Sequence, residues 1–421
     1  VLFRSASLRL RNEHVNLYLG KNPENTPRYW LAFPVSVPPL GFSTYTLSPI
    51  KAGASTTLSN TTTIKGNTTR SVEIGSGNLK LQFSADEGKL IFQYANARNL
   101  VNATVEQSYS YYKAFSGTDE DPQASTAVIF RPNGTVPIEV KPEGQASFTV
   151  MKGPLVDEVH QQLSPWIHQI TRVYKEKEHG EMEFTIGPIP VDDGVGKEII
   201  TQITTDLRTK KAFYTDSNGR DFIKRIRNYR ADYNLEVDQP VAGNYYPINL
   251  GIFVNDSNME LSVLVDRAVG GSSMKDGQIE LMLHRRLLYA DRAIGEALNE
   301  TVCILKECKG LTIKGKYFFR IDRIGEGAQW RRSAGQEIYS PLVLAFSELE
   351  KDWKKNKVLS FSGFNDSYSL PENVAIITLQ ELDCGRTLLR LAHLYEIGEH
   401  EVLSAMAHVK LKKLFPEKEI T

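Results

Sequence analysis

The chain has 421 residues, of which 41% are hydrophobic and 24% are charged, so it is long enough for two or three folded domains with their own cores. Its 50 basic and 50 acidic residues cancel, which argues against nucleic acid as a partner. No apolar run reaches the roughly 18 residues of a membrane-spanning helix, so no membrane span is expected.

The N-terminal region predicts a proline-rich strand region followed by a linker, in a chain that starts within a longer protein. The first residues, VLFRSASLRL, hold neither an initiator methionine nor a hydrophobic signal core, as expected of a processed subunit or an incomplete sequence. Residues 29–47 are rich in proline and strand-forming residues, whereas residues 51–70 are rich in serine and threonine. The second stretch predicts a solvated linker.

From about residue 71 the pattern is one of short alternating strands bounded by turn residues, which predicts a mainly β protein. Residues 79–83 (LKLQF) and 90–94 (LIFQY) predict a hairpin. Residues 244–254 and 259–265 predict a second hairpin around a polar tip. A change of composition near residue 308 predicts a domain boundary.

Helical periodicity is scarce. The best amphipathic candidates are residues 222–233 and 347–355, and both are short. We therefore expect mostly sheet.

Cysteines and glycosylation signals indicate the compartment. The three cysteines, Cys303, Cys308 and Cys384, allow one local disulfide and one free thiol. Seven Asn-X-Ser/Thr sequons occur, where chance would give about three. They begin at Asn60, Asn67, Asn102, Asn133, Asn255, Asn299 and Asn365. This excess favours the secretory pathway, and a cytosolic protein with coincidental sequons is the alternative.

No residue motif identifies a catalytic centre by itself. The eight histidines fall in no tight metal-ligand spacing. Asp192 and Asp193 lie between prolines and glycines, which predicts a solvated turn rather than a pair of catalytic carboxylates. Ser272 and Ser273 follow two glycines, but no histidine stands in a defined relation to them. A tight connection is therefore preferred over a nucleophile loop.

The stretch 265–286, VDRAVGGSSMKDGQIELMLHRR, ends in two adjacent arginines. In a regular strand, Arg285 continues an apolar face and Arg286 lies on the opposite, more polar face. The apolar face comprises Ile279, Leu281 and Leu283, and the opposite face comprises Glu280, Met282 and His284. An arginine that continues an apolar face must emerge at the strand end or find a buried partner. Ligand hydroxyl groups or Asp266 could be that partner, and an interdomain salt bridge is the alternative.

Several segments, in the family's order, resemble the C-terminal half of glycoside hydrolase family 38 α-mannosidases of the lysosomal or vacuolar type, with a plant-like character. They are RYWLAFPVSVPPLGFSTYTL (28–47), QASTAVIFRPNG (123–134), GPIPVDDGVGKE (187–198), NYYPINLGIFVND (244–256), the 265–286 stretch and GQEIYSPLVLAF (335–346). The resemblance covers nearly the whole chain from about residue 28, and no resemblance is recognised in residues 1–20.

The resemblance implies a mainly β fold of β-sandwich domains. Its expected parts are the end of a small β domain (1–50), the linker (51–70), a large galactose-mutarotase-like β super-sandwich (71–308) and a C-terminal β-sandwich (309–421). In the family, an upstream α/β domain carries a zinc ion bound by histidines and aspartates, and one aspartate is the nucleophile of a retaining mechanism. The zinc ligands and the nucleophile are therefore expected upstream of this chain.

The resemblance also implies that this chain supports the sugar site. The family's arginine region at the end of the 265–286 stretch lies close to the bound mannose. Arg285 and Arg286, with Asp266, are therefore the expected substrate-binding residues. A substrate-contacting tyrosine of the family falls in the strand 127–130, where this chain has Val128. That contact is expected to be missing.

These observations predict the C-terminal β region of a retaining, zinc-dependent α-mannosidase that hydrolyses terminal α-mannosyl residues of N-glycan oligosaccharides. We expect it to be inactive alone and to reside in the lysosome, the vacuole or outside the cell. Its expected partners are the upstream α/β domain and a mannose-containing oligosaccharide, and the sequence leaves a homo-oligomer open.

Two alternatives to this function remain. The first is a non-catalytic carbohydrate-binding sandwich that uses aromatic residues such as Tyr111, Tyr112 and Trp166. The second is a purely structural module that touches no sugar.

Overall fold

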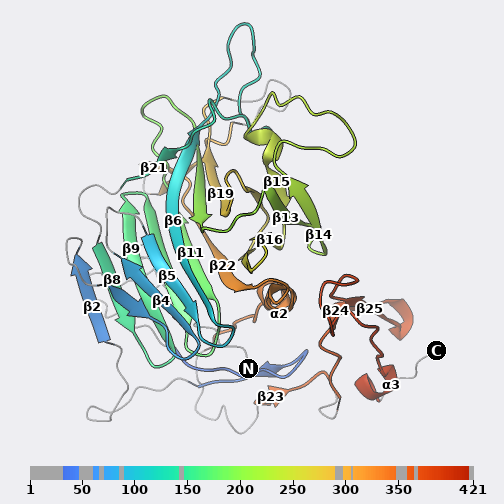
Figure 1. Cartoon of the computed structure of the whole chain (residues 1–421). Coiled ribbons are helices and arrows are strands. Elements are labelled where there is room, and N and C mark those ends of the chain that lie inside the picture. The colour runs from blue at the N-terminus through green and yellow to red at the C-terminus, as the bar shows by residue number, and fades with distance from the viewer. Residues whose placement is uncertain are drawn as a thin grey trace.

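The computed structural model describes nine segments of the chain: 32–46, 60–65, 71–84, 90–141, 147–289, 297–304, 307–347, 358–364 and 368–416. Most of them belong to two large antiparallel sheets that face each other, with a helix beside them and a smaller C-terminal part below (Figure 1). This arrangement confirms the predicted mainly β fold built on a β-sandwich. No helix of the described residues is long and apolar enough to cross a membrane.

The first large sheet has nine strands, and its order is β15-β18-β19-β12-β6-β5-β4-β3, with β7 paired to β6. The strands are β3 (Val72–Ile74), β4 (Leu79–Ser84), β5 (Leu90–Asn96), β6 (Val101–Lys113), β7 (Ile138–Glu139), β12 (Lys197–Thr204), β15 (Tyr246–Ile248), β18 (Val269–Ser272) and β19 (Gln278–Arg286). The predicted hairpin of residues 79–83 and 90–94 is confirmed as β4 and β5, with Leu81 opposite Tyr94 and Phe83 opposite Phe92.

The second large sheet has ten strands in the order β14-β13-β16-β17-β22-β11-β10-β9-β8-β2. They are β2 (Asn60–Lys65), β8 (Ser147–Lys152), β9 (Val156–Ser164), β10 (Ile167–Tyr174), β11 (Gly180–Ile186), β13 (Ala212–Ser217), β14 (Asp221–Ile226), β16 (Gly251–Asn255), β17 (Met259–Val265) and β22 (Ile313–Arg323). The helix predicted over 222–233 is therefore wrong at its start, because residues 221–226 pair with β13 as an edge strand.

Apolar side chains from the inner faces of both sheets form one core. Residues of β6 alternate between buried and more accessible positions from Val101 to Tyr109, as a strand with one face on a core requires. Phe92 of β5 and Phe319 of β22 meet across the core with ring centroids 5.5 Å apart. Burying one side chain of that size contributes roughly 1.5–3 kcal/mol to the free energy of folding. The sum of many such contacts holds the two sheets together.

The second predicted hairpin is confirmed only in part. β16 and β17 pair as expected, but residues 246–248 form β15 in the other sheet. The chain changes sheet where the Asp216 carboxylate accepts hydrogen bonds from three consecutive backbone N–H groups. These belong to Asn249, Leu250 and Gly251, at 2.8, 2.8 and 3.0 Å from Oδ1. At this corner the three N–H groups pair with neither sheet, and the carboxylate accepts their hydrogen bonds instead.

The sandwich exceeds the predicted domain limits at both ends. β22 lies between β11 and β17, well past the predicted end at residue 308, because Tyr317, Phe319 and Ile321 supply core side chains. The composition change near residue 308 marks only the hairpin of β20 (Thr301–Ile304) and β21 (Glu307–Gly310). β2 lies inside the predicted linker 51–70, so part of that stretch is an edge strand.

Helix α2 (Gly327–Tyr339) covers part of the ten-stranded sheet (Figure 1) and was not predicted. Trp330 and Ala334 pack with Leu250 and Leu264. The indole N–H of Trp330 donates to Nδ1 of the buried His179 at 3.2 Å. The other helix predicted from sequence, 347–355, lies outside the described residues apart from its first residue.

The described residues after α2 form small sheets rather than the predicted C-terminal β-sandwich. β23 (Ser360–Phe361) pairs with β1 (Phe42–Ser43), and β24 (Val374–Glu381) pairs with β25 (Thr387–His393). Among the residues that the structure describes, the short helices are α3 (Leu411–Leu414) and η5 (Asp383–Gly385) in this part and η3 (Ala242–Asn244) ahead of β15. Arg332 of α2 contacts Glu399 through Nε and Nη2, at 3.0 and 2.8 Å, and so joins this part to the sandwich.

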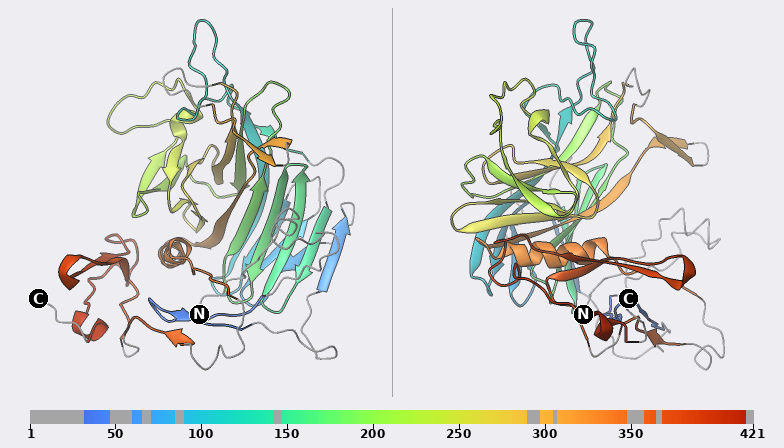
Figure 2. Two further views of the ribbon diagram at one scale, coloured as in Figure 1. Left: turned by 180° about the vertical axis from the view of Figure 1, so that it is seen from behind. Right: turned by 90° about the vertical axis from the view of Figure 1, so that its right-hand side faces the viewer.

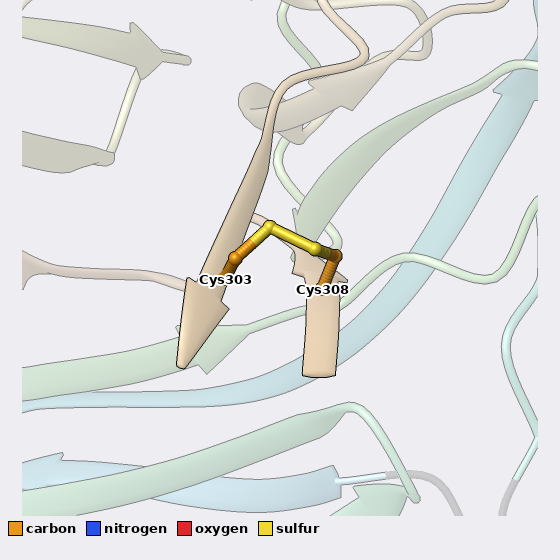
Figure 3. The surroundings of a disulfide bond; sticks show 2 residues. All are labelled: Cys303 and Cys308. Atoms are coloured by element: carbon orange, nitrogen blue, oxygen red, sulfur yellow. A yellow bond between two sulfur atoms is a disulfide. The ribbon is translucent and has the colours of Figure 1, made fainter. Parts of the chain in front are cut away.

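The local disulfide that the cysteine spacing allows is present. Cys303 and Cys308 lie opposite each other on β20 and β21 and are bonded (Figure 3), whereas Cys384 is free and exposed. Figure 2 shows the hairpin as an orange pair of strands that projects from the sandwich in the right-hand view.

Candidate functional site

A β-bulge at the end of β19 determines where the two candidate arginines point. Glu280 and Met282 lie opposite Gln202 and Ile200 of β12, but the register then shifts. His284 lies opposite Ile199 and Arg285 opposite Glu198, which leaves Leu283 as the extra residue. A bulge changes the face on which later side chains lie.

The predicted faces of the two arginines are therefore wrong. Arg285 shares the outer face of the nine-stranded sheet, the face turned away from the main core, with Met282 and Glu280. Arg286 lies opposite Lys197 and shares the other face with His284.

The guanidinium of Arg285 is enclosed by protein acceptors. Nε and Nη2 donate to Oε1 of Glu198 at 3.1 and 2.7 Å. Nη2 also donates to Ile129 O at 2.8 Å and to Ser125 Oγ at 3.3 Å, and Nη1 donates to Ala127 O at 3.2 Å. Arg285 therefore holds the segment 124–131, which we call the 124–131 loop, against the end of the sheet.

Glu198 is a buried carboxylate that sequence reasoning missed. Its side chain is 0% exposed, and burial raises its pKa even though Arg285 and Ser125 act in the opposite direction. Oε1 accepts from Ser125 Oγ at 2.7 Å as well as from Arg285. Oε2 is buried and has no hydrogen-bond partner. All the hydrogen bonds that the carboxylate accepts therefore go to Oε1.

A second buried carboxylate, Glu280, lies on the same outer face. The hydroxyl of Tyr245 donates to Oε1, and the amide of Gln202 donates to Oε2 at 2.9 Å. Burial raises the pKa of Glu280, and burial also raises the pKa of Tyr245. Apolar side chains surround the pair: Tyr112, Ile200, Val241, Phe130, Met274 and Met282.

Glu198 and Glu280 do not form a glycosidase pair. Glu280 lies opposite residue 202 of β12, four residues along the strand from Glu198, which corresponds to about 13 Å. A retaining glycosidase needs its two carboxyl groups roughly 5 Å apart. Among the described residues, no group of three or more His, Cys, Asp or Glu side chains could hold a metal ion.

Arg286 and Asp266 have separate partners. Arg286 donates from Nη1 to Ile189 O at 2.6 Å and from Nε to Asn299 Oδ1 at 2.9 Å. Asp266 accepts from the Arg267 side chain at 3.0 Å and from Lys316 N at 3.0 Å, beside the ten-stranded sheet. The contacts of Asp266 therefore do not include either candidate arginine, and the acid that meets Arg285 is Glu198.

The remaining sequence candidates have structural roles. Ser272 is fully buried and donates from Oγ to Asn244 O at 2.7 Å, which agrees with a tight connection rather than a nucleophile loop. Asp193 lies in an exposed turn and pairs with Lys197 at 2.8 Å. Val128 lies at a bend of the 124–131 loop rather than in a strand, and its side chain is 63% exposed.

The aromatic residues named for a sugar platform are not free surface rings. Tyr112 is buried beside Phe130, with ring centroids 5.9 Å apart. Tyr111 lies under the Lys197 ammonium at 5.8 Å, and Trp166 packs against the main core. These three residues do not present the stacking surface that the first alternative function requires.

The described sequons differ in exposure. Asn102, Asn133 and Asn299 are exposed, and Asn255 is half-buried. Asn60 begins β2, whereas Asn67 and Asn365 lie outside the described residues. The amide oxygen of Asn299 accepts the bond from Arg286, and glycosylation would modify its nitrogen and leave that bond intact.

Comparisons with known proteins place the chain among α-mannosidases. The family profile described as "Glycosyl hydrolases family 38 C-terminal domain" matches residues 74–293, and that of the "Lysosomal alpha-mannosidase-like, central domain" matches residues 20–47. The chain is 58% identical to an alpha-mannosidase of Arabidopsis thaliana over 98% of this chain and 40% of that protein. It is 50% identical to the alpha-mannosidase of Canavalia ensiformis over 96% of this chain and 41% of that protein.

More distant relatives agree. The chain is 37% identical to the lysosomal alpha-mannosidase of Homo sapiens over 93% of this chain and 38% of that protein. A solved alpha-mannosidase from Enterococcus faecalis matches the fold with a TM-score of 0.52 and 12% identity, over 76% of this chain and 36% of that chain. The chain thus spans about two fifths of the length of its curated relatives. Because the C-terminal domain profile covers more than half of its residues, the chain belongs to glycosyl hydrolase family 38.

Proposed function

We propose that the chain is the C-terminal β region of a retaining, zinc-dependent α-mannosidase that removes terminal α-mannosyl residues from N-glycan oligosaccharides. The observation that carries this proposal is the match to α-mannosidases along 93–98% of the chain. The described residues do not fit a zinc ion, because they contain no cluster of suitable ligands. We therefore assign zinc and the nucleophile to an upstream part of the protein and derive no step through them here.

The share of this chain in the reaction is one wall of the sugar site. The 124–131 loop and the ends of β12 and β19 form that wall, and Arg285 fixes the loop by bonding two of its carbonyl oxygens. Because each of the three guanidinium nitrogens already has an acceptor, Arg285 supports the sugar site mainly by holding the loop. The same enclosure favours the structural module as the second candidate function, in which the loop meets no sugar.

A kinetic comparison tests the proposed function. An aryl α-mannoside is offered to this purified chain and to a longer protein that contains it together with the upstream domain. We expect turnover only by the longer protein. Turnover by the chain alone would overturn the assignment of catalysis to the upstream domain. A longer protein without α-mannosidase activity would overturn the proposed function.

We further propose a secretory route ending in the lysosome or vacuole. The Cys303–Cys308 disulfide and the exposed sequons at Asn102, Asn133 and Asn299 support it, since both features belong to oxidising compartments. Digestion of the native protein with a peptide N-glycosidase should lower its mass. An unchanged mass would contradict this route.

A further inference from the structure

We infer that Glu198 is a positioning residue that sets the place of the 124–131 loop, and through it the affinity of the enzyme for its mannoside substrate. This inference rests on the proposed function. It concerns a residue that itself makes no contact with substrate, because its side chain is 0% exposed.

One oxygen atom organises the base of the loop. Oε1 of Glu198 accepts from Ser125 Oγ inside the loop, at 2.7 Å, and twice from Arg285 outside it, at 2.7 and 3.1 Å. Charge-assisted hydrogen bonds of this kind are shorter and stronger than neutral ones. Glu198 therefore fixes both the first part of the loop and the arginine that binds the rest.

The loop needs this support because it has little regular structure of its own. Thr126 N donates to Ile129 O at 2.9 Å, and Ile129 N donates back to Thr126 O at 3.3 Å, which closes a tight turn. The turn presents Val128 outward. The carbonyl oxygens of Ala127 and Ile129 on either side of this tip are held by Arg285. If Arg285 shifts, both carbonyl bonds are lost together.

The 124–131 loop also contacts the neighbouring residue Tyr245. Phe130 makes an edge contact with Tyr245, with ring centroids 4.7 Å apart, and the Tyr245 hydroxyl bonds Glu280. Asn244, next to Tyr245, receives a bond at Oδ1 from Asn228 N and donates to Pro240 O, both at 2.8 Å. The loop is thus packed against Tyr245, whose neighbour Asn244 bonds both ends of the 228–240 segment, so displacement of the loop also disturbs the packing of Tyr245.

A residue that places a binding wall affects substrate affinity more than the chemical step. Interactions made equally in the ground state and the transition state change KM and leave kcat nearly unchanged. We therefore expect Glu198→Gln to raise KM about tenfold, the effect of losing one charge-assisted hydrogen bond, and to leave kcat within about twofold.

Two measurements on Glu198→Gln test the inference. Hydrogen exchange of this chain should show faster exchange of the backbone amides in 124–131, by about tenfold. Steady-state kinetics of the longer protein should show the change in KM. The matched control is Glu181→Gln, another buried carboxylate, which pairs with Arg172 and Lys316 on the ten-stranded sheet. It should leave both readouts unchanged.

The outcomes separate the inference from the proposed function. If the unaltered longer protein hydrolyses no α-mannoside, the proposed function fails, and exchange in 124–131 still decides whether Glu198 holds the loop. If the protein is active and Glu198→Gln leaves KM unchanged, or changes it no more than Glu181→Gln does, the inference is overturned. If Glu198→Gln does not fold, Ser125→Ala replaces it, and KM should rise about tenfold, because this variant also loses one charge-assisted hydrogen bond to Oε1.

Discussion

Replacing Arg285 with methionine should destabilise the sandwich by leaving a buried carboxylate without its counter-charge. Glu198 is 0% exposed and the Arg285 side chain is 17% exposed, so solvent can replace the guanidinium only in part. The change also removes the donors to Ala127 O and Ile129 O. Removing one member of a buried pair costs about 3–5 kcal/mol, and we expect a loss of that size in the free energy of unfolding at neutral pH.

The loss should shrink in acid. Burial already raises the pKa of Glu198 above its usual value, and removal of Arg285 raises it further, because the cation favoured the ionised form. A group whose pKa is raised in the folded state favours folding below its unfolded pKa, and this contribution is lost as pH rises through the folded pKa. The difference between Arg285→Met and the unaltered chain should therefore be largest above neutral pH and smaller near the ordinary pKa of glutamate.

Urea denaturation followed by tryptophan fluorescence, at two pH values, measures both effects. The informative control is the double variant Arg285→Met with Glu198→Gln, which removes the unpaired charge. Its stability should exceed that of Arg285→Met by at least about 1 kcal/mol, because the uncompensated carboxylate is gone. A double variant that is as unstable as the sum of the two single variants, or an Arg285→Met variant that loses less than about 1 kcal/mol, would refute the reasoning.

Three further predictions concern other parts of the chain. Burial lowers the pKa of His179 to about 4, so its contribution to stability is complete above the unfolded pKa of about 6.5 and is lost as pH falls toward 4. His179→Gln should accordingly flatten the fall of Tm over that pH range. A thiol reagent should titrate only Cys384 in the native protein and all three cysteines after reduction; a second reactive thiol before reduction would contradict the disulfide. Arg332→Ala should free the C-terminal part from helix α2, because it removes the bidentate hydrogen bond from Arg332 to Glu399. Limited proteolysis after residue 340 should then be faster than in the unaltered chain.

Much of the fold followed from strand periodicity, because one face of each strand is buried. The hairpin of β4 and β5 was predicted with its residues in the right places, since Leu79, Leu81 and Phe83 alternate with polar residues. The family resemblance was confirmed separately, by the profile match to residues 74–293.

The errors arose where tertiary contacts override local pattern. Helix α2 was missed although Trp330, Ala334 and Ile338 recur every four residues, because glycines and arginines interrupt the run. The first residues of 222–233 show a helical pattern but pair with β13. The boundary near residue 308 follows a hairpin tip, and only the long-range pairing of β22 shows that the sandwich continues.

The acid partner of Arg285 was not predicted from the sequence, which offered Asp266 where the structure has Glu198. A glutamate in a run such as KEIITQIT gives no local sign that it is fully buried, because the run mixes polar and apolar residues without a regular alternation that would assign each to a face. Asp266 was the nearer candidate in sequence, whereas Glu198 is 87 residues from Arg285 and meets it only through the pairing of β12 with β19.

One extra residue decides which side chain meets Glu198. In a regular β19 the pairs of residues 280 and 282 with 202 and 200 would continue, and His284 would lie opposite Glu198. A histidine there could balance the buried carboxylate only when protonated, so the pair would depend on pH. The bulge at Leu283 brings Arg285 to that position instead, and a guanidinium stays charged at every physiological pH. The hold on the 124–131 loop therefore keeps its positive partner as the pH falls, and protonation of Glu198 is the change of charge that would weaken it.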